Sequence, residues 1–239
     1  MTPLKWAVAT FTVIPVGNFD PDRRAAGAAM ALAPLAVLPL AVTVVGMTFL
    51  PLPPTVLAVL IVAALAIGTR AMHLDAVADV ADALGGGWTP QRATEILHRG
   101  DMGPMGAVAL ALCLMAQVAS LAHILPGDSW AAVGAAVLVS RCAVVIVCRH
   151  GVRPMPASRL GALVAGSVHP ALALAVLMAG TALLALVNPW AVVVTIMAWL
   201  AVAGLVAVTS SRFDGVNGDV MGAAIELAFT VLLVGWTAL

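Results

Sequence analysis

The stretch PWAVVVTIMAWLAVAGLVAVT, residues 189–209, has no charged side chain and is long enough to cross a bilayer as one helix. Apolar residues make up 63% and charged residues 9% of the 239-residue chain, and its formal net charge is zero. Soluble domains have about 45–50% apolar and about 25% charged residues. This composition excludes an ordinary soluble globule, a disordered chain and a basic nucleic-acid-binding module. It predicts an all-α, polytopic transmembrane helix bundle that forms a single integral-membrane domain over residues 1–239.

Seven apolar runs predict about seven membrane spans, within a range of six to eight. His169 and Pro170 interrupt the fifth run, so its span is expected at about 171–187. Pro34 and Pro39 lie in the first run, where a helix bundle tolerates them as kinks. The runs lie at 27–50, 55–72, 103–125, 130–148, 160–187, 189–209 and 220–239.

The charged residues are divided unequally between the connecting segments. Segments 1–26, 70–102, 149–159 and 210–219 carry ten of the 11 basic residues, and Arg141 lies within a span. Segments 51–54, 126–129 and 188–189 carry only one charge, Asp128. The positive-inside rule makes the basic side cytoplasmic, so the N-terminus is expected in the cytoplasm. The spans themselves carry few polar groups, which favours chemistry at the cytoplasmic face over a transport path.

Three aspartates recur at i, i+4 and i+7 in HLDAVADVADALGGG, residues 73–87. Asp75, Asp79 and Asp82 therefore share one face of a helix that is expected to extend the second span. Like charges at this spacing repel each other, and Mg²⁺ prefers such carboxylate oxygens together with substrate phosphate. The pattern predicts a magnesium site; the alternative is a solvated helix end with spare acids. A zinc site is a poor fit, because His73 has no accompanying His and Cys set.

A short helix is expected after the glycines at 85–87, with Thr89 as its N-cap and Pro90 as its first residue. Arg92, Glu95 and Arg99 fall within a narrow arc of this helix. Arginine pairs suit phosphate groups, so the helix predicts a phosphate contact. The alternative is a surface helix that carries an ion pair.

A second acidic group opens the last span. Asp219 and Glu226 are seven residues apart, and the small residues between them leave room for a partner helix or a ligand. Glu226 lies inside an apolar span, which makes it a functional candidate that could pair with Arg141. Both acidic groups are expected at the cytoplasmic face, where Asp219 would face the aspartates of residues 75–82. Together they predict a two-metal site for phosphoryl transfer in a membrane-embedded, Mg²⁺-dependent transferase.

Taken in order, these motifs resemble the cobalamin synthase family of adenosylcobinamide-GDP ribazoletransferases. The family pattern H-L-D-G-x-A-D-x-x-D-G is similar to residues 73–83, and L-E-I-M-[KR]-D-S-R-x-G-x-x-G is similar to residues 94–106. The pattern G-D-x-x-G-A-x-x-E matches residues 218–226, F-x-x-x-P matches residues 11–15, and a Ser-Arg pair matches 140–141. This chain has Ala76 and Ala83 in place of glycines, and Arg99-Gly100-Asp101 in place of Asp-Ser-Arg.

The resemblance implies a late step of cobalamin biosynthesis. The 3′-hydroxyl of α-ribazole, or of its 5′-phosphate, would attack adenosylcobinamide-GDP and release GMP. The expected partners are these substrates and the lipid bilayer of a bacterial plasma membrane, without nucleic acid, and a homo-oligomer is compatible with the sequence. The expected site residues are Asp75, Asp79, Asp82 and Asp219 for Mg²⁺, His73 and Glu226 for catalysis, and Arg92, Arg99, Asp101 and Arg141 for substrate.

Two other functions remain open on the sequence. A CDP-alcohol phosphatidyltransferase would use related chemistry, but its D-x-x-D-G-x-x-A-R signature is absent. A membrane transporter is the alternative from another class. Release of GMP from adenosylcobinamide-GDP would separate the transferase from both.

Overall fold

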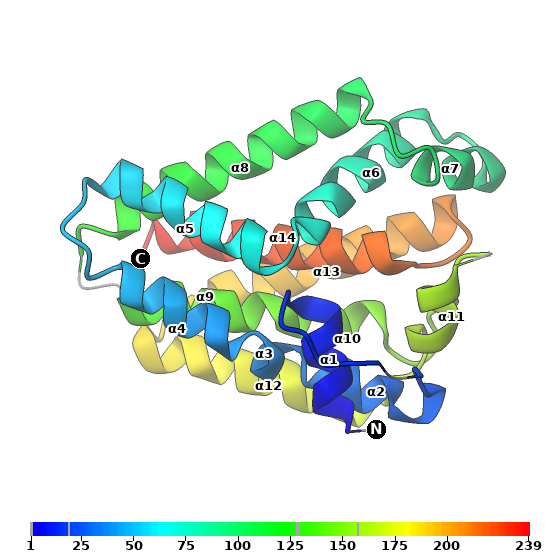
Figure 1. Ribbon diagram of the computed structural model, residues 1–239, viewed down its shortest axis with the longest axis horizontal. Coiled ribbons are helices and arrows are strands. Elements are labelled where there is room, and N and C mark those ends of the chain that lie inside the picture. The colour runs from blue at the N-terminus through cyan, green and yellow to red at the C-terminus, as the bar shows by residue number, and fades with distance from the viewer. Residues whose placement is uncertain (1, 19, 128–129, 157) are drawn as a thin grey trace.

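The computed structural model describes residues 2–18, 20–127, 130–156 and 158–239. The described residues form helices joined by short loops, without a β-strand (Figure 1). Asp128, the single charge expected on the extracellular side, lies outside the described residues. The helices are α1 (Pro3–Phe11), α2 (Arg23–Ala31), α3 (Ala33–Ala36), α4 (Leu38–Met47), α5 (Pro54–Gly68), α6 (Met72–Gly86), α7 (Pro90–Leu97), α8 (Pro104–Ile124), α9 (Trp130–Ser140), a 3₁₀ turn (Arg141–Ala143), α10 (Val144–Val147), α11 (Arg159–Val164), α12 (Pro170–Val187), α13 (Ala191–Arg212) and α14 (Gly218–Trp236).

Five helical segments of the described chain are long and apolar enough to cross a membrane. They are α8, the continuous segment from α9 to α10, α12, α13 and α14; the bent pair α5–α6 counts as a sixth only if both helices together form one span. An all-α polytopic bundle is therefore confirmed. The narrower span expected in the fifth run is also present, because α12 begins at Pro170 and the short helix α11 precedes it.

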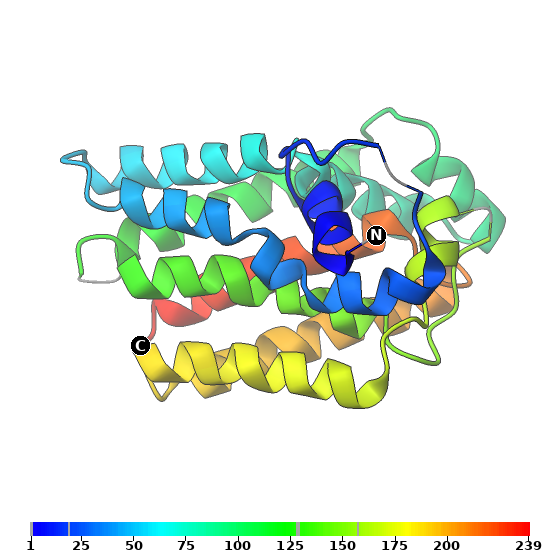
Figure 2. The same ribbon diagram turned by 60° about the horizontal axis from the view of Figure 1, so that its bottom comes forward.

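The first apolar run is divided into short helices at its prolines. Pro34 lies at the start of α3 and Pro39 at the start of α4. The first N–H groups of a helix have no acceptor within the helix, so a proline there removes no hydrogen bond. The helices α2, α3 and α4 follow one another along the bundle (Figure 2). The expected kinks are therefore present, as one-residue interruptions of the helix at Leu32 and Val37.

The second apolar run does not continue straight into the aspartate helix, so that prediction was wrong. Helix α6 is bent by 89° relative to α5. Arg70 and Ala71 make the turn with φ angles of 57° and 55°, a left-handed conformation that non-glycine residues rarely adopt. The turn allows α6 to lie against α14, where Gly222 is so close that an added Cβ would be 2.7 Å from the Cβ of Ala76. The bend and the three aspartates of α6 place this helix at the polar end, outside the membrane-spanning segments.

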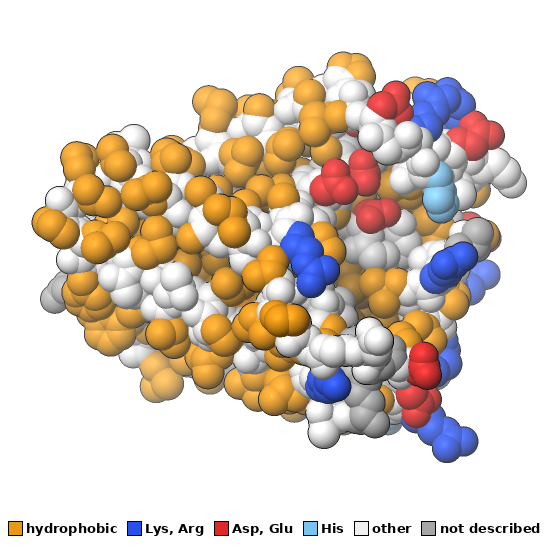
Figure 3. All heavy atoms as spheres, in the orientation of Figure 1, with side chains coloured by type: hydrophobic (Ala, Val, Ile, Leu, Met, Phe, Trp, Pro, Cys, Tyr) orange, Lys and Arg blue, Asp and Glu red, His pale blue; other side chains and the backbone are white. Residues whose placement is uncertain are grey.

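The molecule has a polar end and an apolar end. Charged side chains gather over the end that carries α6, α7 and α11, and hydrophobic side chains cover the opposite end (Figure 3). The exposed hydrophobic side chains include Ile67, Leu186 and Trp190, which are 73%, 85% and 72% exposed. Such exposure is expected of surfaces that contact lipid. The C-terminus lies at the apolar end (Figure 1).

Three loops at the polar end hold the start of α14 in place. Met155 donates its backbone N–H to the carbonyl of Val216 at 2.9 Å, and Val216 donates to the carbonyl of Arg153 at 3.0 Å. Val168 bonds in the same way to Cys148. The bonds of Arg153 and Met155 tie their loop to the loop before α14 and so help to position the start of this helix, where Asp219 is the second residue.

Candidate active site at the polar end

Aspartates from α6 and α14 come together at the polar end. Asp75 and Asp219 line the same cavity of about 250 Å³, together with side chains from α1 and α11. Asn217 caps α14 by accepting the backbone N–H of Val220, and its amide donates to Asp219 Oδ2 at 2.6 Å. The N-cap therefore orients the Asp219 carboxylate. Asp219 therefore faces Asp75, as the sequence analysis expected, whereas Glu226 lies deeper in the bundle and does not line this cavity.

Asp79 lies in the middle of this acidic group and is partly buried. Burial, followed by the negative charges of Asp75, Asp219 and Asp82, raises the pKa of Asp79 from 3.8 to about 6. The carboxylates of α6 and α14 are thus close enough to act on one another. Such mutual repulsion is relieved when a cation binds between them.

The chemistry of these side chains fits a hard divalent cation, because all are oxygen donors. In the described part of the chain, however, no three His, Cys, Asp or Glu side chains are close enough together to hold one metal ion. Magnesium commonly takes one or two carboxylates and completes its coordination with water and substrate phosphate. The residues therefore fit a magnesium ion that is bound together with the substrate.

Asp82 has a structural role that the other two aspartates of its row lack. Its Oδ2 accepts the backbone N–H of Gly103 at 2.7 Å, and its Oδ1 accepts that of Gly106 at 2.8 Å. The first N–H groups of a helix have no acceptor within the helix. At the N-terminus of α8 the Asp82 carboxylate supplies this acceptor and stabilises the helix. An added Cβ at Gly106 would lie 2.2 Å from Asp82 Oδ2. Asp82 therefore joins α6 to α8, with both oxygens already engaged.

A second cavity, of about 310 Å³, lies at the other end of the aspartate row. Arg92, Arg99, Asp101 and Asp82 line it. Thr89 caps α7 by accepting the N–H of Arg92 at 3.2 Å, as expected from the Thr-Pro pair. Arg92 also forms an exposed ion pair with Glu95 at 2.7 Å. The helix thus has both features weighed in the sequence analysis, an ion pair on its surface and arginines that line a cavity.

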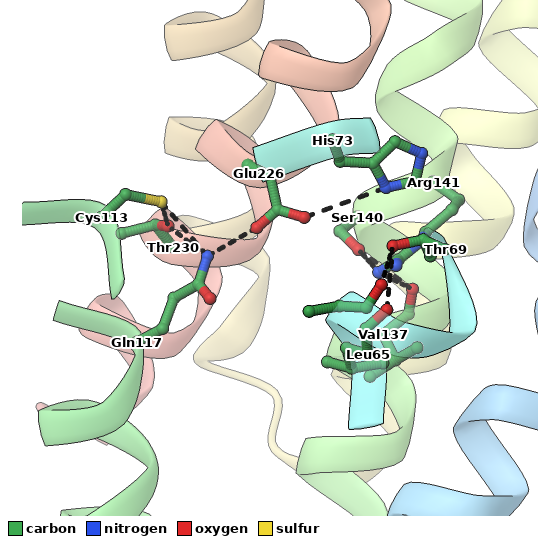
Figure 4. Close-up of polar contacts among 11 residues, drawn as sticks. Leu65, Thr69, His73, Cys113, Gln117, Val137, Ser140, Arg141, Glu226 and Thr230 are labelled. Atoms are coloured by element: carbon green, nitrogen blue, oxygen red, sulfur yellow. Dashed lines mark hydrogen bonds and ion pairs between the residues drawn. The ribbon is translucent and has the colours of Figure 1, made fainter. Parts of the chain in front are cut away.

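Glu226 is buried among polar side chains of three other segments (Figure 4). Its Oε2 accepts the Nε2 amide of Gln117 at 2.7 Å, and its Oε1 lies 3.9 Å from Nδ1 of His73. Gln117 Nε2 also donates to Thr230 Oγ1 at 3.1 Å. His73 in turn lines the cavity that contains Asp75 and Asp219. The His73 ring therefore lies between Glu226 and the cavity that contains Asp75 and Asp219.

Arg141 lies in the core and does not fit the substrate contact expected for it. It is 1% exposed, and Nη1 donates to the carbonyl of Val137 at 3.1 Å and to Ser140 Oγ at 2.9 Å. It is absent from the linings of the described cavities that also contain the site residues. Its charge acts on Glu226, but the two side chains form no direct ion pair. Inside the bundle, the positive charge of buried Arg141 therefore offsets the negative charge of buried Glu226.

The sequence analysis did not identify Gln117, Thr230, Thr10 or Leu160. Gln117 had a signal that could have found it, because it is the one amide in the otherwise apolar stretch of α8. Thr10 and Leu160 line the cavity with Asp75 and Asp219. No sequence pattern marks these two residues, since they reach the cavity only through the packing of α1 and α11.

Comparisons with known proteins agree with this arrangement of motifs. A family model described as cobalamin-5-phosphate synthase matches residues 3–237. An adenosylcobinamide-GDP ribazoletransferase from Nocardioides sp. is 39% identical and covers 98% of this chain and 97% of the relative. Proteins of the same name from Frankia casuarinae and Corynebacterium efficiens are 31% and 36% identical, covering 99% and 76% of this chain and 95% and 69% of the relatives. No solved structure matches the chain significantly.

Proposed function

The chain belongs to the cobalamin-5-phosphate synthase family, and from this premise we propose that it joins α-ribazole, or its 5′-phosphate, to adenosylcobinamide-GDP with release of GMP. The ribose hydroxyl oxygen forms a bond to the cobinamide-side phosphorus. The bond from this phosphorus to the bridging oxygen of GMP breaks, and GMP leaves with that oxygen. The hydroxyl loses its proton in the process.

One observation carries this proposal. Acidic side chains that are far apart in the sequence, on α6 and α14, lie together at the polar end between two cavities. A transferase that joins two substrates needs two neighbouring binding sites and a means to stabilise negative charge between them. A simple hydrolase would need only one of these two binding sites.

The two cavities differ in the charge of their linings. Arg92 and Arg99 line the larger cavity, which suits the GDP part of adenosylcobinamide-GDP. Among the described residues, the lining of the smaller cavity has no Lys or Arg; it contains Asp75 and Asp219 at one side, together with Phe11 and Thr10. It suits the benzimidazole ring and the ribose of α-ribazole. The aspartate row of α6 runs between the two.

His73 and Asp75 are the side chains best placed for the attacking hydroxyl, since both line the smaller cavity. A neutral imidazole nitrogen with a free lone pair accepts a hydrogen bond from this hydroxyl, orients it, and takes its proton. The close packing of Gly222 on α14 against Ala76 and the backbone of His73 on α6 would hold the imidazole in place for this contact.

Asp75 and Asp219 would hold magnesium together with a substrate phosphate, Asp79 would add its negative charge beside them, and Asp82 would position α6 by joining it to α8. Bound there, Mg²⁺ would supply stabilisation of the negative charge that develops on the phosphate oxygens. The polar end would face the cytoplasm, because the basic residues gather there. Both substrates would then enter from the cytoplasm of a bacterial cell.

The test is a discontinuous assay with the purified full-length protein in detergent. We expect GMP to be released from adenosylcobinamide-GDP only when α-ribazole and Mg²⁺ are both present, with one corrinoid product formed for each GMP. GMP release without α-ribazole would indicate a hydrolase. Absence of GMP release under all conditions, with uptake of a charged solute into vesicles, would support a transporter instead.

A further inference from the structure

The face of α6 opposite the aspartates lines a third cavity, of about 380 Å³, which we call the apolar cavity. Val77, Val80, Ala81 and Leu84 follow the i, i+3, i+4, i+7 pattern of a single helix face. Helices α8, α13 and α14 supply the other walls. Leu112 of α8 is among the lining residues and is 61% exposed, so the cavity opens to the outer surface of the bundle.

The described walls of the apolar cavity offer no polar side chain that lacks a partner. The two polar side chains of the lining, Cys113 and Thr230, have their sulfur and oxygen atoms 3.3 Å apart, and Gln117 donates to both (Figure 4). A cavity of this kind does not retain water and binds apolar groups. If it stayed empty, its lining side chains would lose dispersion contacts. The chemistry of the walls therefore calls for a hydrocarbon occupant.

The depth of the apolar cavity along the spans matches the level of lipid acyl chains. Helix α8 begins and α13 ends at the polar end (Figure 1). Ala109 is five residues after Pro104 in α8, and Leu205 is seven residues before Arg212 in α13. At 1.5 Å per residue, both lie about 10 Å from the polar ends of their helices. In a bilayer this depth is hydrocarbon beneath the headgroups, so an acyl chain borders the opening.

A positively charged side chain lies between the apolar cavity and the polar end. Arg212 is seven residues after Leu205 and therefore lies on the same face of α13. Its Nη2 is 3.4 Å from the carbonyl oxygens of Leu84, which lines the cavity, and of Gly87. Among the described residues, no acid is within ion-pair distance of Arg212, and its buried Nε has no hydrogen-bond partner. The protein therefore leaves this charge without a direct counterion.

The side chain of Trp88 lies beside this cation. The Arg212 guanidinium carbon is 5.4 Å from the centre of the Trp88 ring, within the range of a cation–π contact. Trp88 is 80% exposed, and tryptophan is enriched at the level of lipid headgroups. A guanidinium at this level suits phosphate, which it binds through parallel N–H donors. The cation and the apolar cavity thus match the two parts of a phospholipid.

We propose that the apolar cavity and Arg212 form a binding site for one phospholipid of the bilayer, with an acyl chain in the cavity and the phosphate at Arg212. Basic pockets between membrane helices bind lipid headgroups in this way. The bound lipid packs against the apolar face of α6 and so supports the helix that carries the aspartates. The site does not depend on the proposed reaction, because its lining shares no residue with the two polar cavities.

Native mass spectrometry of the full-length protein, purified in detergent and delipidated, measures the binding directly. The probes are dioleoyl phosphatidylglycerol and dioleoylglycerol, which have the same acyl chains and differ in the phosphate-containing headgroup. We expect the wild type to retain one phosphatidylglycerol, and Arg212→Gln to bind it at least about tenfold more weakly, with no such loss for dioleoylglycerol. Equal affinities of the two proteins for phosphatidylglycerol, or an equal loss for both lipids, would overturn the inference.

Arg24→Gln is the matched control for charge. Arg24 is an exposed arginine at the start of α2, outside the lining of the apolar cavity. This variant removes the same charge and should keep the affinity of the wild type for phosphatidylglycerol. If it weakened binding as much as Arg212→Gln does, general attraction of the lipid to a basic surface would explain both results and the inference would fail.

The acyl-chain part is tested by filling the apolar cavity. Ala109→Phe places a ring in it from a half-buried position of α8 and should weaken the binding of both lipids at least about tenfold. Ala107→Phe is the matched control, because it adds the same ring at an exposed position of the same helix outside the lining. Wild-type affinity in Ala109→Phe would overturn the inference. Displacement of the lipid by α-ribazole would also overturn it, since the substrate would then be the occupant.

Thermal unfolding in detergent separates loss of the site from loss of the fold. We expect phosphatidylglycerol to raise the unfolding midpoint of the wild type and of Ala107→Phe, but not that of Ala109→Phe. An equal rise in all three proteins would contradict the site. If Arg212→Gln does not accumulate, Arg212→Lys takes its place. It keeps the charge but loses the planar donors, so it should bind phosphatidylglycerol more weakly than the wild type, and equal affinity would contradict the inference.

Discussion

The three aspartates of α6 share one helix face but lie in different surroundings. Their substitution is therefore expected to have different effects. Asp75 is exposed and lines the smaller cavity, Asp79 lies between other carboxylates, and Asp82 caps α8 with both of its oxygens. Sequence periodicity predicted their common face but could not separate these roles. The partners of Asp82 are backbone N–H groups more than twenty residues away, which no side-chain pattern marks.

The first prediction concerns the stability contributed by Asp82. In Asp82→Asn, one carboxylate oxygen is replaced by an NH₂ group that faces a backbone N–H of α8. We expect a loss of about 1–3 kcal/mol in the free energy of unfolding, the cost of leaving a buried donor unpaired. Asp75→Asn is the control and should not be destabilised, because Asp75 is exposed. Thermal unfolding in detergent measures both, and equal midpoints would contradict the capping role.

The second prediction concerns the pH dependence that Asp79 introduces. Its pKa of about 6 lies above its ordinary 3.8, so between these pH values the folded state binds more protons than the unfolded state. In EDTA, the contribution of Asp79 to stability is therefore greatest below about pH 4 and is lost as the pH rises through about 6. Asp79→Asn should lack this part of the dependence. Unfolding midpoints between pH 4 and 7.5 that change identically in both proteins would contradict it.

At the scale of elements, the break between α5 and α6 sets the position of the site. Gly68 is the last residue of α5, but residues 69–73, TRAMH, contain neither Gly nor Pro, so the sequence does not mark a left-handed turn at residues 70 and 71. The turn at Arg70 and Ala71 is imposed by tertiary packing, in which Gly222 of α14 admits Ala76 of α6. By contrast, the starts of α7 and α14 have local caps, Thr89 and Asn217. Only the cap of α7 was predicted from the sequence.

The third prediction belongs to α7, whose arginines line the larger cavity. Arg92→Gln and Arg99→Gln should each raise the KM for adenosylcobinamide-GDP about tenfold, since a charged hydrogen bond contributes about 1.5–3 kcal/mol. The KM for α-ribazole should change little. Glu95→Gln is the control, because it removes the ion-pair partner of Arg92 and keeps both arginines. Equal increases in the KM of both substrates would contradict the assignment of the cavities.

For the whole molecule, composition was sufficient to predict a polytopic helix bundle, because runs of this length and apolar content have few other structures open to them. The number of spans was harder to predict, since proline positions and the bend before α6 decide where one span ends. The gathering of charge at one end is visible in both the sequence and the surface (Figure 3). The orientation in the membrane is the next quantity to measure.

The fourth prediction concerns this orientation. Single cysteines are placed at Gly127 and at Trp88, both exposed, in a protein whose Cys113, Cys142 and Cys148 are replaced. A membrane-impermeant reagent added to intact cells should label position 127 and not position 88. Position 88 should become labelled only after the membrane is opened. Labelling of position 88 in intact cells would reverse the orientation.

In the proposed function, acids from α6 and α14 together form one magnesium-dependent transfer site. The most direct measurement is a Mg²⁺ titration of GMP release by the wild type and by Asp219→Asn, with Asp214→Asn as a control from the preceding loop. We expect Asp219→Asn to need at least tenfold more Mg²⁺ for half-maximal rate, or to lose activity, while Asp214→Asn resembles the wild type. An unchanged Mg²⁺ dependence and rate in Asp219→Asn would contradict the claim.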